Sequence, residues 1–202
     1  AELQHRSEKT EGTVYLREQG NGFGLGQQNG SETGTRKIGG NMLYRIDGSW
    51  SMGAEAFRQE TLATGAQRDL LELRGNYTMP RYEAQLGVRH VEDTLGIDRQ
   101  LGSDQMFASG RYRFTDRLTG RVQHDQTLGS DDSTDFPTRT IMGLDFKLNE
   151  TATLFADQEY THSAAQETAT SRAGLKASPW TGGQFSSTVE QQTTENGVRL
   201  FT

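Results

Sequence analysis

The stretch KIGGNMLYRIDGSWSMGAEAFRQE, residues 37–60, decides the fold of this chain. In residues 37–46 an apolar side chain or a glycine stands at every second position, and mostly polar residues stand between them. The same two-residue period returns in residues 50–60. Asp47-Gly48-Ser49 lies between them and is typical of a tight turn. The stretch therefore predicts an antiparallel β-hairpin with one apolar and one polar face.

The period recurs along most of the chain. Ten segments show it clearly and predict strands at about 37–46, 50–60, 71–77, 82–88, 106–114, 118–122, 142–146, 152–160, 173–177 and 185–189. Weaker patterns at 12–18 and 198–202 bring the expected total to about twelve strands. The connections alternate between short ones at 47–49, 79–81, 115–117, 148–150 and 178–182 and long ones at 19–36, 61–68, 92–103, 128–137 and 162–170. This rhythm favours an up-and-down sheet.

The composition excludes several classes of protein. Only 32% of the 202 residues are apolar, the mean hydropathy is −0.77, and the chain has no cysteine for a disulfide or a thiolate metal site. A net charge of −6 without a basic stripe argues against nucleic-acid binding. No apolar run is long enough for a membrane-spanning helix, but a membrane-spanning strand is apolar only at every second position, so averaged hydropathy does not reveal it.

Aromatic residues gather beside the short connections. Amphipathic rings are favoured at the level of lipid headgroups, so we expect them to form an aromatic belt at that end of the strands. The expected members are Tyr44, Trp50, Tyr77, Tyr82, Tyr112, Phe114, Phe146 and Trp180.

These patterns together predict an all-β protein, an antiparallel up-and-down transmembrane β-barrel of about twelve strands with short periplasmic turns and longer extracellular loops. Strands of about ten residues suit a tilted crossing of a bilayer, whereas a soluble β-sandwich, the alternative, usually has shorter strands. We expect residues 1–202 to form a single barrel domain. Because residues 198–202 make only half a strand, we expect either more chain beyond Thr202 or a pairing with another subunit.

Several stretches resemble bacterial outer-membrane β-barrel proteins. The sequences FTDRL at 114–118 and KLNETATLF at 147–155 show a strand ending in an aromatic residue, a polar turn and a restarting strand. ASPWTGGQF at 177–185, followed by VEQQ at 189–192, is similar to the barrel domains of large surface proteins. The resemblance implies a place in the bacterial outer membrane, with lipid bilayer and lipopolysaccharide as partners, and other subunits or further domains of the same chain as additional ones.

The phase opposite to the apolar one is rich in charge and would face the lumen of a barrel. The candidate lumen-lining residues are Arg74, Arg89, Arg111, Arg113, Arg121, Arg139, Lys147, Arg172, Lys176, Glu72, Asp145, Asp157 and Glu159. Arg111, Arg113 and Arg121 belong to two strands joined by the short turn 115–117, so they would form a positive cluster on an anion path.

Structural pairing is the alternative for these charges. Buried charges need partners, and Arg121 with Asp145 and Asp157 with Arg172 would pair across adjacent strands. On that interpretation the charged side chains only fill the lumen.

Catalysis is not expected. His90, His124 and His162 lie near the long connections, with Asp93 and Asp125 close in sequence, and outer-membrane proteases of the omptin type use His and Asp at such a rim. No omptin motif matches, however, and the histidines stand in the apolar phase. We therefore expect no enzyme, no catalytic residues, no cofactor and no metal, although the acidic stretch 129–135 offers oxygen ligands for calcium.

The function that follows is a porin-like passive channel for small polar or anionic solutes, because the inward phase is polar and charged. The alternative is a membrane anchor or export barrel of a larger cell-surface protein.

Overall fold

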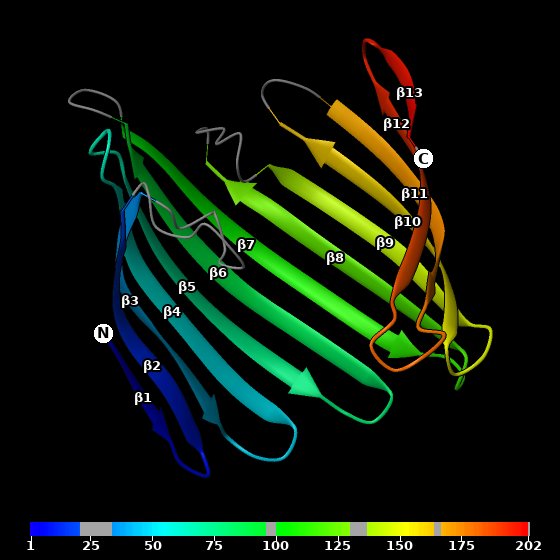
Figure 1. The fold of residues 1–202 in the computed structure, drawn as a ribbon, viewed down its shortest axis with the longest axis horizontal. Helices are drawn as coiled ribbons and strands as arrows, with labels where there is room; N and C mark the ends of the chain where they lie inside the picture. Colours follow the sequence, from blue (N-terminus) through cyan, green and yellow to red (C-terminus); the bar gives the residue numbers. More distant parts are fainter. Residues whose placement is uncertain (21–33, 96–99, 130–136, 164–166, 202) are drawn as a thin grey trace. The chain divides into compact units, whose positions relative to one another are not determined.

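The computed structural model describes residues 1–20, 34–95, 100–129, 137–163 and 167–201. In these residues thirteen strands form one antiparallel sheet in chain order (Figure 1). The strands are β1 (Glu2–Arg6), β2 (Thr10–Gln19), β3 (Thr35–Arg45), β4 (Trp50–Thr61), β5 (Gln67–Thr78), β6 (Tyr82–Thr94), β7 (Gln100–Arg113), β8 (Leu118–Leu128), β9 (Thr138–Lys147), β10 (Ala152–His162), β11 (Glu167–Ala177), β12 (Phe185–Thr194) and β13 (Gly197–Phe201).

The all-β, up-and-down architecture predicted from the sequence is confirmed. The strand total differs by one, because β1 was not expected. Its five residues contain one large apolar side chain, Leu3, and show no period. Pairing with β2 holds them in place, from Glu2 opposite Tyr15 to Arg6 opposite Glu11. Closure of the sheet into a barrel stays a prediction, as does the continuation of the chain beyond Thr202.

The strands divide between two compact units. Unit 1 comprises Ala1–Tyr77, Gly87–Met106 and Leu128–Ser133, and unit 2 comprises Thr78–Leu86, Phe107–Thr127 and Thr134–Thr202. The long strands β6 and β7 contribute residues to both. Unit 1 contains the continuous registers of β1 to β5, and unit 2 those of β8 to β13.

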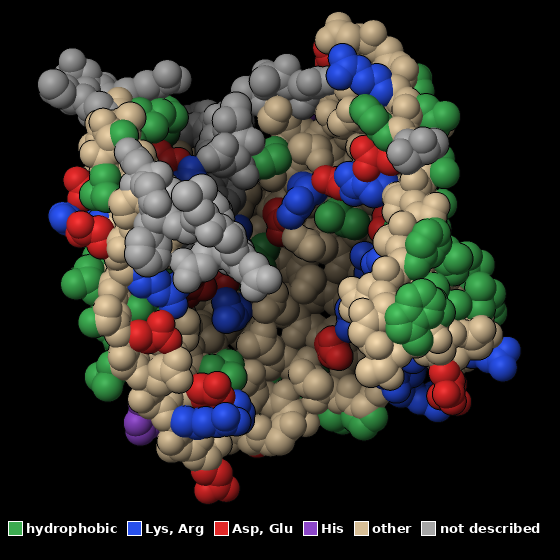
Figure 2. Space-filling view, viewed as in Figure 1, with side chains coloured by type: hydrophobic (Ala, Val, Ile, Leu, Met, Phe, Trp, Pro, Cys, Tyr) green, Lys and Arg blue, Asp and Glu red, His purple; other side chains and the backbone are tan. Residues whose placement is uncertain are grey.

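Each unit has an apolar face that is exposed. On this apolar face Met52 is 57% exposed, Leu73 50%, Leu86 59% and Leu144 51%. Hydrophobic side chains crowd one flank of the C-terminal strands, and Lys, Arg, Asp and Glu gather on their opposite surface (Figure 2). A water-soluble protein rarely exposes so many large apolar side chains together, so this face requires lipid or protein against it.

The opposite, polar face is the more buried one. The buried hydrophobic residues of the described chain, Tyr15, Val91, Phe107 and Phe155, all stand in the phase of the charged residues. The described chain therefore differs from a soluble domain, because its large apolar side chains are mostly exposed and its few buried side chains, Glu72 and Asp125 among them, lie on the charged face.

The short connections are fixed by side chains that accept backbone hydrogen bonds. Asp47 Oδ1 accepts from the N–H groups of Ser49 at 2.7 Å and Trp50 at 2.8 Å, and these bonds lower the pKa of Asp47. Thr115 plays the same part in the β7–β8 turn and Asn149 in the β9–β10 turn. Such Asx and Ser/Thr turns specify a tight reversal, which fixes the register of each hairpin. No helix that could span a membrane, by its length and apolarity, is present in the described chain.

Candidate functional site

A row of charged side chains crosses the polar face of unit 2. The register places Arg121 of β8 opposite Gly143 of β9, which in turn lies opposite Asp157 of β10. Asp157 lies opposite Arg172 of β11, and Arg172 lies opposite Glu190 of β12. Four strands thus contribute charges to one level of the sheet, with a glycine between the first two of them.

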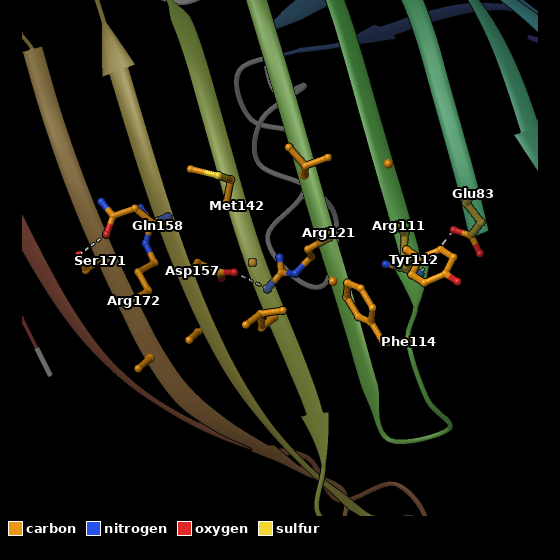
Figure 3. A pocket seen from close by; sticks show the side chains of 17 residues that line it. Glu83, Arg111, Tyr112, Phe114, Arg121, Met142, Asp157, Gln158, Ser171 and Arg172 are labelled. Carbon is orange, nitrogen blue, oxygen red and sulfur yellow. Dashed lines mark hydrogen bonds and ion pairs between the residues drawn. The ribbon is translucent and has the colours of Figure 1, made fainter. Parts of the chain in front are cut away.

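The ion pairs in this row do not follow nearest-neighbour order. The Arg121 guanidinium lies 2.6 Å from Asp157 Oδ1, across β9 (Figure 3). The Nε atom of Arg121 also lies 3.3 Å from Asp145. Arg172 donates to Glu159 at 2.6 Å and to Glu190 at 2.5 Å. The expected pair of Arg121 with Asp145 is therefore present, but that of Asp157 with Arg172 is replaced by Asp157 with Arg121.

Gly143 is what allows Arg121 to reach Asp157. A Cβ added at Gly143 would overlap Asp157 Oδ1 and would lie 2.9 Å from Arg121 Nε. A residue with a Cβ would therefore require the Asp157 or the Arg121 side chain to move from this arrangement. The missing side chain leaves a gap over β9, the glycine slot, through which Arg121 of β8 reaches Asp157 of β10.

Unit 1 carries a comparable cluster around Glu72. This carboxylate is 7% exposed and accepts hydrogen bonds from Arg74 at 2.8 Å and from Arg89 at 2.7 Å. Gly53 opens space here too, since an added Cβ would lie 2.9 Å from Arg74 Nε. Two arginines on one buried carboxylate satisfy it well, which is what a structural charge cluster requires.

Another pair of candidates, Arg139 and Lys176, also has partners on the polar face of unit 2. Arg139 donates to Asp125 at 2.9 Å. The Lys176 ammonium lies 4.7 Å from the centre of the Phe155 ring, a cation–π contact. The Phe155 ring fits because Gly174 has no side chain, as an added Cβ would lie 2.7 Å from ring carbons.

The remaining candidates, Arg111, Arg113 and Lys147, lie together at the short-turn end of the polar face. They line a cavity of about 300 Å³ with Arg81 of the β5–β6 turn. Arg111 is 3.6 Å from Glu83, and both side chains are more than half exposed. Arg121, which the sequence grouped with Arg111 and Arg113, does not line this cavity.

The apolar face of unit 2 has a groove of its own. Its volume is about 850 Å³, and its lining includes Tyr112, Phe114, Met142 and Leu144 (Figure 3). Small residues leave this space, and the Phe114 ring packs over Gly120, where an added Cβ would lie 2.7 Å from Phe114 Cε2. Residues of the charged row, Arg121, Asp157 and Arg172, also contribute to its lining, but its large exposed side chains belong to the surface that requires an apolar neighbour.

The expected belt residues stand on the apolar face or in the short connections. Trp50 packs against Tyr77 with 4.4 Å between ring centres, and Tyr112 meets Phe114 edge-on at 5.0 Å. Trp180, in the β11–β12 connection, is 70% exposed. The other members, Tyr44, Tyr82 and Phe146, are each about 40% exposed. Their contact with lipid headgroups stays a prediction.

The three histidines lie at the bases of three different long connections, and the carboxylates expected beside them are engaged elsewhere. Asp93 binds Arg68 at 2.6 Å and Asp125 binds Arg139 on the polar face. The ring nitrogens instead meet side chains across their own hairpins, His90 with Asp104 at 2.7 Å, His124 with Thr140 at 2.8 Å and His162 with Glu167 at 2.8 Å.

Each of these histidine pairs therefore joins the two strands of one hairpin. In the described residues no three His, Asp or Glu side chains are placed to hold a metal ion, and the possible calcium stretch lies almost entirely outside those residues. The absence of enzymatic activity stays a prediction.

Sequence reasoning missed two kinds of residue in this region. The glycines that admit ion pairs and rings, Gly143, Gly53 and Gly174, look like any other glycine until the register is known. Arg81 was assigned to a turn and not to the charged face. A usable signal for Arg81 exists, because it lies immediately before a strand in the phase of Glu83.

Solved structures show which fold this is. The chain is similar to OccAB4 of Acinetobacter baumannii, with a TM-score of 0.65 and 8% identity over 98% of this chain and 61% of that one. It is similar to the outer-membrane expressed OmpT of Vibrio cholerae, with a TM-score of 0.56 and 12% identity over 82% of this chain and 54% of that one. The KdgM porin gives a TM-score of 0.44 and 12% identity over 82% of this chain and 88% of that one.

The chain thus spans between half and two thirds of OmpT and OccAB4. No protein-family model and no curated protein matches the sequence. At these identities the likeness concerns the fold, and it confirms the resemblance to outer-membrane β-barrel proteins at that level.

Proposed function

We propose that this chain belongs to a porin-like channel of the bacterial outer membrane that passes small polar solutes and favours anions. The observation that carries the proposal is the division of each unit into an apolar face of exposed large side chains and an opposite face that carries the charges. A strand protein in lipid needs the first, and a water-filled passage needs the second. The likeness in fold to OccAB4 and OmpT agrees with an outer-membrane location.

The preference for anions rests on the short-turn end of the polar face. Arg81, Arg113 and Lys147 line the cavity there and have no ion pair in the described residues, whereas Glu83 and Asp145 both have arginine partners. Uncompensated positive charge in a narrow passage favours anions, since screening is weak where water is scarce.

Single-channel recording on the full-length gene product in planar bilayers tests this function. We expect stepwise conductance, with a reversal potential in a salt gradient that indicates anion preference. Folding is checked separately by β-type circular dichroism in detergent and by a change of electrophoretic mobility on heating. A folded, inserted protein without conductance would reject the channel and favour an anchor or export barrel.

A further inference from the structure

The cavity at the short-turn end of unit 2 has the lining of an anion site. Its walls come from the β5–β6 turn and from strands β6 to β10. Four cationic residues line it, namely Arg81, Arg111, Arg113 and Lys147. Its lining also contains the carboxylates of Glu83 and Asp145 and the hydroxyls of Tyr82, Thr119 and Thr153. The lining of this cavity of about 300 Å³ therefore contains twice as many cations as carboxylates.

Both carboxylates already have partners. Asp145 lies 3.3 Å from Arg121, which is outside the cavity lining, and Glu83 lies 3.6 Å from Arg111. Among the residues that the structure describes, Arg81, Arg113 and Lys147 form no ion pair. The cavity thus carries an excess of positive charge, and three of its four cations have no ion-pair partner among the described residues.

Two of these cations are cross-strand neighbours. The backbone N–H of Arg113 donates to the carbonyl of Arg81 at 2.7 Å, so the two residues stand beside each other on adjacent segments. Like charges in adjacent positions of a sheet destabilise it. A bound anion would reduce that repulsion, and in the described residues neither arginine forms an ion pair.

We propose that this cavity binds a small oxyanion, with a phosphate group as its preferred ligand. The guanidinium groups of Arg81 and Arg113 offer paired N–H donors that match two oxygens of a phosphate, and Lys147 adds a point charge. The hydroxyls of Thr119 and Thr153 supply neutral donors. The assignment rests on the proposed function in one respect, because an anion site at this end would lie on the path of the solutes that the channel passes.

Phosphate binding is measured independently of conductance. The full-length protein in a non-ionic detergent is titrated with inorganic phosphate by calorimetry at low ionic strength. We expect saturable binding to one site and a loss of about tenfold in affinity for R113Q, since each charge-assisted hydrogen bond to an oxyanion is worth at least that factor. The triple variant R81Q/R113Q/K147Q should show no measurable binding.

The matched control is R117Q. Arg117 lies in the β7–β8 turn at the same end of unit 2 and carries the same charge, but it does not line the cavity. It should bind phosphate as the parent does. Equal loss in R117Q and R113Q would show that only the general positive potential matters and would overturn the site, as would absence of binding in the folded parent.

A second titration separates a lipid headgroup from a free phosphate. A short-chain phosphatidylglycerol below its micellar concentration is added in place of inorganic phosphate. Equal or weaker binding of the lipid supports a soluble oxyanion, and tighter binding supports a headgroup phosphate, provided that R113Q reduces it. Conductance without phosphate binding would reject the site and retain the channel, whereas phosphate binding without conductance would reject the channel and retain the site.

Discussion

Replacing Gly143 by alanine tests whether the glycine slot holds the charged row together. The added Cβ would occupy the space of Asp157 Oδ1 and press against Arg121 Nε. The Asp157 side chain is 12% exposed and that of Arg121 is 31% exposed. Their pair is therefore intermediate between a surface pair, worth up to about 1 kcal/mol, and a buried one, whose disruption costs about 3–5 kcal/mol.

The expected loss in the free energy of unfolding is about 1–2.5 kcal/mol. Breaking the pair costs about 2–3 kcal/mol on this scale, and alanine recovers about 0.5–1 kcal/mol because it is less flexible than glycine in a strand. Urea unfolding of the protein in detergent, followed by tryptophan fluorescence, measures the change. G110A is the matched control, since a Cβ at Gly110 would meet Val122 Cγ1 at 3.6 Å and the Glu83 carbonyl oxygen at 3.9 Å, both ordinary contacts.

A double-mutant cycle decides the cause. In a D157A background the Oδ1 atom is gone and the Arg121 side chain can shift away from the added Cβ. G143A should then no longer destabilise and should gain about 0.5–1 kcal/mol from the backbone. If G143A costs the same in both backgrounds, the glycine does not serve the ion pair and the slot interpretation is wrong.

Two further predictions concern single charges. D47N should flatten the pH dependence of stability, because hydrogen bonds from two backbone N–H groups lower the folded-state pKa of Asp47. The stabilisation by these bonds is complete above the ordinary aspartate pKa and is lost as the pH falls below about 4. Unfolding midpoints of parent and variant measured across this pH range will show the difference, and equal slopes would contradict it. R121Q should lower stability but should shift the reversal potential of a conducting channel much less than R81Q/R113Q/K147Q does. The reason is that Asp145 and Asp157 already offset the charge of Arg121. An equal shift would mean that Arg121 faces the permeating ion unpaired.

The strands and their order could be predicted from the sequence because both depend on local information. A two-residue period is visible within a single segment, as in 37–46, and turn residues such as Asp47 and Asn149 mark where a strand ends. Neither requires knowledge of which residue lies opposite which. β1 lay beyond this reasoning because five residues without alternation carry no local signal, and only pairing with β2 orders them.

The partners of the charged residues could not be predicted, because partner choice depends on register. A shift of one residue exchanges the two faces, and a shift of two residues moves every cross-strand neighbour. Asp157 lies opposite Arg172 in the register, as expected, but Arg172 donates to Glu159 and Glu190 instead. On the other side of Asp157, Gly143 lets Arg121 reach it across β9.

The same register moves the anion site away from where the sequence placed it. Arg121 lies on the strand that follows Arg111 and Arg113 and in the same alternating phase, so the sequence alone predicts one cluster of three arginines. In the fold, two carboxylates surround Arg121 and offset its charge. Arg113 is left beside Arg81, a residue contributed by a turn, and beside Lys147. The unpaired positive charges of unit 2 therefore concentrate at its short-turn end, and we expect any selectivity for anions to act on solutes as they pass that end.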